Sequence, residues 1–207
     1  MKIEHLITVY LLFSLLFATG CLSRAPQTPI QFYSLSSDYS VSSTDRPPSG
    51  ISLGILPFES SSAIERRMMY RISPVQVGYY DFHKWVEPPA EMVTRSFCDG
   101  LASSGLFSVV SIEGTFPMKH FDWLLSGNLL RFERDQTTER PTAYISMYLQ
   151  IRIPEKGRRV IWGKKCSSRV PISGESATDF AVALDRGLQE INKKTAVELE
   201  KLIHRQN

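Results

Sequence analysis

Asp81 and His83 are the two side chains whose types and spacing could support acid–base chemistry. In an extended segment, side chains two residues apart lie on one face, so the Asp81 carboxylate could orient the His83 imidazole as a general base. His120 is the other histidine that could act as a base, because His5 and His204 lie near the two ends of the chain. The alternative interpretation is a solvated polar pair on a strand rich in aromatic residues.

The sequence lacks the short motifs of the common enzyme classes. It contains no GxSxG, HExxH, GxxxxGK[ST] or GxGxxG motif and no EF-hand loop. No residue type and spacing indicates a nucleophile, a metal site or a cofactor site. We therefore expect a protein that is not an enzyme and that binds neither a metal nor a dissociable cofactor.

The amino-terminal residues predict the cellular compartment. Leu6 to Ala18 form a mainly apolar run of 13 residues, too short for a membrane span of about 20 residues and typical of a signal peptide. The following Ala18-Thr19-Gly20-Cys21 resembles the bacterial lipobox, in which signal peptidase II cleaves before a lipid-modified cysteine. We expect residues 1–20 to be a signal peptide and Cys21 to carry a diacylglycerol and an N-acyl chain such as palmitate. More than one acyl chain is what stable membrane attachment requires.

The residues after Cys21 predict where the protein goes and where its fold begins. Leu22 is not the aspartate that retains enterobacterial lipoproteins in the inner membrane, so we expect an outer-membrane lipoprotein facing the periplasm. Residues 22–30 contain two prolines and little to bury, which predicts that residues 21–30 are the lipidated cysteine and its tether. Residues 31–207 then form a single periplasmic domain.

The composition is that of one folded domain. Hydrophobic residues make up 43% of the 207 residues, which excludes a wholly disordered chain. The 24 Lys and Arg residues exceed the 21 Asp and Glu residues by only three. This balance does not supply the basic face that nucleic-acid binding needs, so we expect no nucleic-acid partner.

Two cysteines remain after the predicted lipidation of Cys21. Cys98 lies in a helical pattern and Cys166 in a strand-like pattern, and neither belongs to a CxxC motif. A disulfide is permitted in the oxidising periplasm. Two separate buried thiols are the other possibility.

Hydrophobic periodicity predicts an α/β (α+β) fold, a two-layer sandwich of a mainly antiparallel sheet with two main helices. One helix opens at Pro88-Pro89 and stops near Gly105, with Val93, Phe97 and Leu101 as its buried stripe. The other begins at Ser176, where Asp179 completes an approximate capping box, and its apolar stripe runs from Phe180 to Leu202. In Thr142–Ile153 the odd positions are predicted to face inward. The predicted strands are Gln31–Leu35, a strand from Ile51 to Pro57, Arg66–Ser73, Val75–Trp85, Leu106–Ile112, Phe121–Glu133, Thr142–Ile153 and Arg159–Val170.

The most informative feature of the mature chain is an aromatic hairpin, which we expect to be formed by Arg66–Ser73 and Val75–Trp85. Aromatic residues with a polar group favour interfaces. The alternative is cross-strand packing in the core, which should account for at least half of these residues. The candidate partner-contact residues are Tyr70, Tyr79, Tyr80, Phe82 and Trp85.

The order of these features resembles one protein family, the ABC-type transport auxiliary lipoproteins, which include the paraquat-inducible C-type lipoproteins. The resemblance is spread over nearly all of the mature chain. It is carried by Cys21, Phe32-Tyr33-Ser34-Leu35, Ile51 to Pro57, Met69-Tyr70-Arg71, Tyr79-Tyr80, Trp85 with Pro88-Pro89, Gly105-Leu106-Phe107 with Val109, and Leu125 to Phe132.

The resemblance implies a non-enzymatic outer-membrane partner of an MCE-domain lipid-transport system. The fold would be similar to the amino-terminal domain of the Tol-system propeller protein. The partner would be an MCE-domain protein of an ABC lipid transporter, and a homo-oligomeric ring is a plausible geometry because MCE proteins form rings. Two alternatives remain: an envelope-structural or outer-membrane assembly lipoprotein, and a periplasmic lipid-binding carrier.

Overall fold

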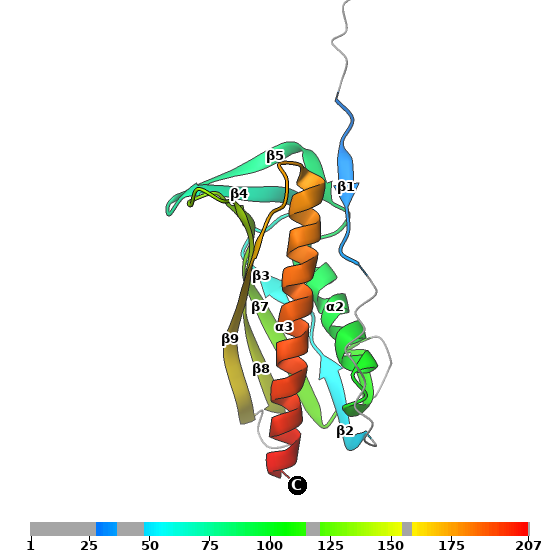
Figure 1. Ribbon diagram of the computed structural model, residues 1–207. Helices are drawn as coiled ribbons and strands as arrows, with labels where there is room; N and C mark the ends of the chain where they lie inside the picture. Colours follow the sequence, from blue (N-terminus) through cyan, green and yellow to red (C-terminus); the bar gives the residue numbers. More distant parts are fainter. Residues whose placement is uncertain (1–27, 37–47, 115–120, 155–158, 207) are drawn as a thin grey trace, which may run out of the picture.

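The computed structural model describes residues 28–36, 48–114, 121–154 and 159–206, which form nine strands and two helices (Figure 1). The helices are α2 (Pro89–Ser103) and α3 (Ala177–Gln206). The strands are β1 (Gln31–Tyr33), β2 (Ser49–Ile55), β3 (Glu59–Ser60), β4 (Arg67–Ser73), β5 (Gln76–Trp85), β6 (Phe107–Ile112), β7 (Trp123–Asp135), β8 (Thr142–Ile153) and β9 (Arg159–Pro171).

All nine strands belong to one sheet, in which β7 is the central strand. Along one edge, β7 pairs in parallel with β2, β3 and β4, and along the other it pairs antiparallel with β8. The β7–β8–β9 ladder and the β4–β5 hairpin are antiparallel, whereas β1 joins β5 and β6 joins β2 in parallel. Strands from distant parts of the sequence therefore meet on β7.

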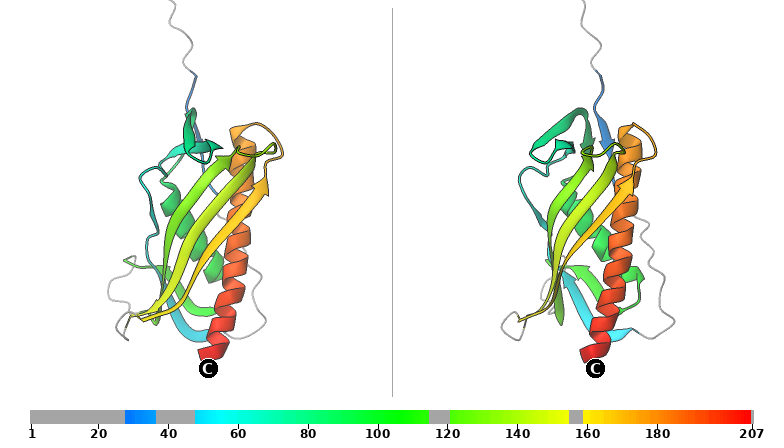
Figure 2. Two further views of the ribbon diagram at one scale, coloured as in Figure 1. Left: turned by 90° about the vertical axis from the view of Figure 1, so that its left-hand side faces the viewer. Right: turned by 60° about the vertical axis from the view of Figure 1, so that its left-hand side comes forward.

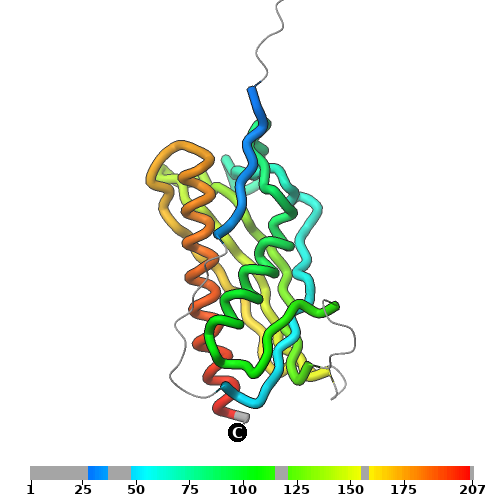
Figure 3. Tube along the Cα trace, turned by 90° about the vertical axis from the view of Figure 1, so that its right-hand side faces the viewer, coloured from blue at the N-terminus to red at the C-terminus, as the bar shows by residue number. Residues whose placement is uncertain are grey.

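Both helices cover the same face of this sheet, and within the described residues no helix covers the other face of β7, β8 and β9 (Figures 1 and 2). The predicted stripe of α2, Val93, Phe97 and Leu101, is buried, and so is the alternating set of β8 from Ala143 to Ile151. Figure 3 shows α2 and α3 side by side on the sheet, and the Asn192 amide of α3 donates to Ser96 Oγ of α2 at 2.8 Å. The two-layer α/β prediction is confirmed.

The long helix α3 begins where the sequence predicted. The backbone N–H of Asp179 donates to Ser176 Oγ at 3.1 Å, and the backbone N–H of Ser176 donates to the Asp179 carboxylate at 3.2 Å. These two bonds satisfy donors that the first turn of a helix leaves free. The buried stripe of α3 runs from Phe180 to Leu199 and packs against β8 and β9.

One expected side-chain pattern is corrected by a β-bulge in β7. The sequence pattern puts Leu124, Asn128, Leu130 and Phe132 on one face. The pairing with β8 shifts between Leu129 and Arg131, so Leu130 is an extra residue. A bulge reverses the alternation, and Phe132 therefore enters the core while Leu130 stays exposed.

The uncovered sheet face carries a cluster of paired charges beyond the bulge. Glu133 is fully buried on this face, and its carboxylate accepts from Arg71 Nε at 2.8 Å and from Arg131. Asp135 accepts from Arg169 Nη1 at 2.6 Å. The Arg169 guanidinium also lies 3.8 Å from the centroid of the Tyr144 ring. These contacts make the face polar at this end, where three arginines surround two carboxylates.

The two ends of the described chain lie at opposite ends of the molecule. β1, the first described strand, pairs with the last residues of β5 at the upper edge of Figure 1. The carboxyl-terminal end of α3 lies at the lower end of the same view. The upper end, formed by β1, the β4–β5 hairpin and the start of α3, is called the tethered end below, after the predicted tether of residues 21–30.

Candidate functional site

The β4–β5 hairpin supplies the candidate site at the tethered end. Its strands turn at Ser73-Pro74-Val75-Gln76, where Ser73 pairs with Gln76. Gly78 lies directly against the Tyr70 ring: a Cβ at position 78 would sit 2.5 Å from this ring. Glycine is needed here because the ring crosses the neighbouring strand at close range. The predicted aromatic hairpin is therefore present.

Tyr70 and Tyr80 form a ring cluster with His83. The Tyr70 and Tyr80 rings meet edge to face at 5.2 Å between centroids, and the Tyr80 and His83 rings meet at 5.5 Å. Tyr79 lies outside this cluster, where its hydroxyl donates to the Ala63 carbonyl at 2.8 Å. All three tyrosines are half-buried, so each has one side in contact with the fold and one side open.

Trp85 occupies a different environment from the other candidate residues. Only 1% of its surface is exposed, and its ring packs against Phe132 and Phe180 at centroid distances of 5.2 and 6.2 Å. This is the position of a core residue, so Trp85 is removed from the candidate surface. Phe82 is 44% exposed and remains on it.

The acid–base pair that Asp81 and His83 could form does not occur. His83 Nδ1 lies 3.0 Å from the Tyr33 hydroxyl, which itself donates to the Gln31 side chain at 2.7 Å. This hydrogen bond joins the imidazole to β1. Asp81 is exposed, and within the described ranges no hydrogen bond or ion pair joins it to His83. For His83, the structure therefore favours the alternative interpretation, a polar residue on a strand rich in aromatic residues.

Exposed apolar side chains concentrate at the tethered end. Val75, at the hairpin tip, is 94% exposed. Exposed apolar residues that gather in one region of a domain are candidates for an interaction site. The sequence patterns did not single out most of these residues, although an apolar residue beside a proline at a turn is a usable signal. The tethered-end apolar set is Ile30, Phe32, Ile72, Val75, Val77 and Phe82.

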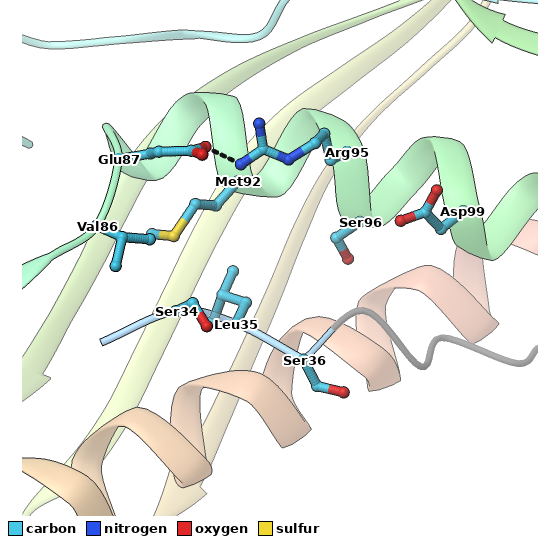
Figure 4. A pocket seen from close by; sticks show the side chains of 9 residues that line it. All are labelled: Ser34, Leu35, Ser36, Val86, Glu87, Met92, Arg95, Ser96 and Asp99. Carbon is cyan, nitrogen blue, oxygen red and sulfur yellow. Dashed lines mark ion pairs between the residues drawn. The ribbon is translucent and has the colours of Figure 1, made fainter. Parts of the chain in front are cut away.

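A small groove lies between α2 and the segment that follows β1 (Figure 4). Its volume is about 150 Å³. The Glu87 carboxylate and the Arg95 guanidinium pair across its rim. Burial raises the pKa of Asp99 at the other end of the groove, against the lowering effect of Arg95. Because its cation is already paired, the groove is a poor binding site for an anion.

Cys98 and Cys166 are both free thiols. Burial is the main cause that raises the pKa of each thiol. Among the described residues, no group of three or more His, Cys, Asp or Glu side chains is placed to hold a metal ion. No helix in this part of the chain is long and apolar enough to cross a membrane.

Two of the predicted features lie outside the described residues. Cys21, with the signal peptide before it, falls in residues 1–27, and His120 falls in residues 115–120. Their sequence predictions stay as predictions. The surface that the structure assembles consists of the tethered-end apolar set with the half-buried tyrosines of the hairpin.

The comparisons with known proteins agree with this fold. Protein XCC0632 from Xanthomonas campestris has a TM-score of 0.75 at 18% identity, over 85% of this chain and 98% of that one. The hypothetical protein CT253 from Chlamydia trachomatis has a TM-score of 0.51 at 8% identity, over 75% of this chain and 98% of that one. At these identities the likeness shows the fold alone. No curated protein matches the sequence.

A two-layer domain with its helices on one sheet face, preceded by a predicted lipid anchor, is the class that the fold and sequence define. Residues 33–196 match the sequence profile of the ABC-type transport auxiliary lipoprotein component. The chain belongs to this family, as its sequence resemblance predicted.

Proposed function

We propose that this protein is a non-enzymatic outer-membrane accessory of an ABC/MCE-type intermembrane lipid-transport system. Its acylated Cys21 anchors it in the outer membrane, and the domain docks the MCE-domain protein in the periplasm. Family membership over residues 33–196 is the observation that carries this proposal. The family's auxiliary role in transport favours a binding function over catalysis.

The position of the anchor supports docking close to the outer membrane. Thr28 is the first described residue, seven positions after Cys21. Seven residues span at most about 25 Å when extended. The tethered end of the domain is therefore held near the bilayer, and the distal end of α3 points away from the anchor.

The tethered-end apolar set is the surface we assign to the MCE partner. Val75 and Phe82 offer apolar area, and the half-buried Tyr79 offers a ring under the Arg67 guanidinium, whose central carbon lies 4.2 Å from the ring centroid. Interfaces are enriched in such aromatic and arginine groups. Several copies in a ring would present this surface repeatedly to a ring-shaped partner.

Membrane anchoring is tested by fractionation of the Cys21→Ser variant. Without the thiol, no acyl chain can be attached, and we expect the variant in the soluble fraction, with Cys98→Ser as the matched control that stays with the outer membrane. Continued membrane fractionation of Cys21→Ser would contradict the lipoprotein assignment.

Docking is tested by affinity capture from cross-linked envelopes. We expect the MCE-domain protein to co-purify with the wild type and to be lost at least several-fold with Val75→Ser and Phe82→Ser. The matched control is Val160→Ser, an exposed valine at the start of β9 and outside the tethered end. Capture of a cell-wall or assembly component in place of the MCE-domain protein would favour the envelope-structural alternative and overturn the proposal.

A further inference from the structure

An open cavity of about 510 Å³ lies at the tethered end. It lies between β5, the end of β7 and the loop that leads into α3. The side chains that bear on its chemistry are Tyr80, Arg134, Gln136, Ser173 and Glu175.

Arg134 is the unusual member of this cavity. Only 6% of its surface is exposed, and its Nη1 donates to the Tyr80 hydroxyl at 3.2 Å and to the Glu175 carbonyl at 2.8 Å. Its Nε is buried without a hydrogen-bond partner. Both acceptors line the cavity, so the guanidinium lies at the cavity wall.

Arg134 also differs from the other arginines near the end of β7. Arg71, Arg131 and Arg169 each pair with a carboxylate. Within the described residues, no carboxylate forms an ion pair with Arg134. Burying a cation without a counter-ion is costly. This arrangement is explained if an anion from outside the chain completes the pair.

The neighbouring groups favour an oxyanion with several acceptors. Because the Tyr80 hydroxyl accepts from Arg134, its own proton is available for donation, and no described residue accepts it. Gln136 and Ser173 add neutral polar groups. The Glu175 side chain, exposed at the rim, is the acidic group of the lining and disfavours an anion.

We propose that this cavity binds a phosphate group, held by the Arg134 guanidinium and the Tyr80 hydroxyl. A phosphate offers acceptors in several directions, which suits donors that come from different elements. The phosphate could belong to a lipid headgroup or to a free phosphate compound. Only the lipid source depends on the proposed function, since it requires the anchored domain to lie at the bilayer.

The test is calorimetric titration of the acylated full chain in a maltoside detergent. Separate titrations use inorganic phosphate, short-chain dihexanoyl phosphatidylglycerol and acetate at equal ionic strength. We expect Arg134→Met to weaken phosphate binding at least tenfold and the control Arg169→Met to leave it unchanged. Binding of the phospholipid but not of inorganic phosphate assigns the headgroup, and the reverse assigns a free phosphate; both support a phosphate site. Acetate binding as tight as phosphate binding would overturn it.

Thermal unfolding without added anion separates a binding role from a structural one. Arg134→Met removes a buried charge without a counter-ion together with the two hydrogen bonds of Nη1, so its Tm is read together with its phosphate binding. Glu175→Gln should tighten phosphate binding by removing repulsion.

If Arg134→Met lowers the Tm and phosphate binding persists, Arg134 is structural. If Glu175→Gln lowers the Tm and weakens binding, Glu175 is the missing counter-ion. Either result refutes the phosphate site, and neither bears on Cys21 fractionation.

Discussion

Arg71 donates two hydrogen bonds to the Glu133 carboxylate across the β4–β7 pair, from Nε to one oxygen at 2.8 Å and from Nη2 to the other at 3.1 Å. Glu133 is fully buried although it lies on the sheet face that no helix covers. The side chains of Arg71 and Arg131, which bind the Glu133 carboxylate, shield it from solvent where no described helix does. The Glu133 hydrogen bond is also the main cause that raises the pKa of Arg71.

Glu133→Ala should destabilise the fold by about 3 kcal/mol, because breaking a buried pair leaves the remaining charges without a partner. The free energy of unfolding is measured by urea denaturation followed by circular dichroism. Glu139→Ala, in the exposed turn after β7, is the control and should change stability by less than about 0.5 kcal/mol. Equal effects of the two substitutions would contradict a structural role for the Glu133 pair.

Asp135 should make the stability depend on acid pH. Although burial opposes the shift, hydrogen bonds from Thr137 and Arg169 lower the pKa of Asp135 from 3.8 to about 2. A lowered carboxyl pKa stabilises the fold above the unfolded-state value, and this stability is lost as pH falls from about 4 towards 2. We expect the wild type to lose up to about 2 kcal/mol more than Asp135→Asn over this window. Unfolding curves at pH 5, 4, 3 and 2.5 measure this difference, and parallel pH dependence of the two proteins would rule the prediction out.

Trp85→Ala should lower stability by about 4 kcal/mol, as truncation of a large aromatic side chain in a core does. The reason is that Trp85 packs between Phe132 and Phe180. Phe82→Ala, three residues earlier on the same strand, should change stability by less than about 0.5 kcal/mol. Loss of partner capture by Trp85→Ala therefore reports unfolding, and a Trp85→Ala protein that stays fully stable would contradict the core assignment.

The two thiols should be recovered free. Cys98 lies on α2 and Cys166 on β9, and burial raises the pKa of both. We expect slow alkylation at pH 7 in the folded protein and complete alkylation of both after unfolding without reductant. Mass spectrometry counts the modified cysteines. Recovery of a Cys98–Cys166 bridge would contradict the structure.

Regular local patterns were predicted well from the sequence. The alternation of β8, the stripes of α2 and α3, and the Ser176–Asp179 cap depend only on neighbouring residues, so the sequence reports them directly. The bulge at Leu130 has no periodic signature, and it changed the face of Phe132. The parallel pairing of β1 with β5 joins segments about fifty residues apart and could not be read from either one.

The candidate site was predicted only in part. An aromatic residue packs equally well on either side of a strand, so the pattern did not separate exposed Phe82 from buried Trp85. Arg134 shares the inner face with Phe132 two positions before it, where an arginine is not expected. Only the folded structure shows that β5 and the loop before α3 surround Arg134 with neutral acceptors and that no described carboxylate pairs with it.

The 30 residues of α3 set the length of the domain along the helix axis. At 1.5 Å per residue, the helix is about 45 Å long, and it runs from the tethered end to the opposite end of the domain (Figure 1). A fluorophore or epitope fused after Asn207 would be displayed at the end of the domain away from the hairpin, so it would report on the protein without obstructing the surface assigned to the partner. Any component that touches both ends must bridge that distance.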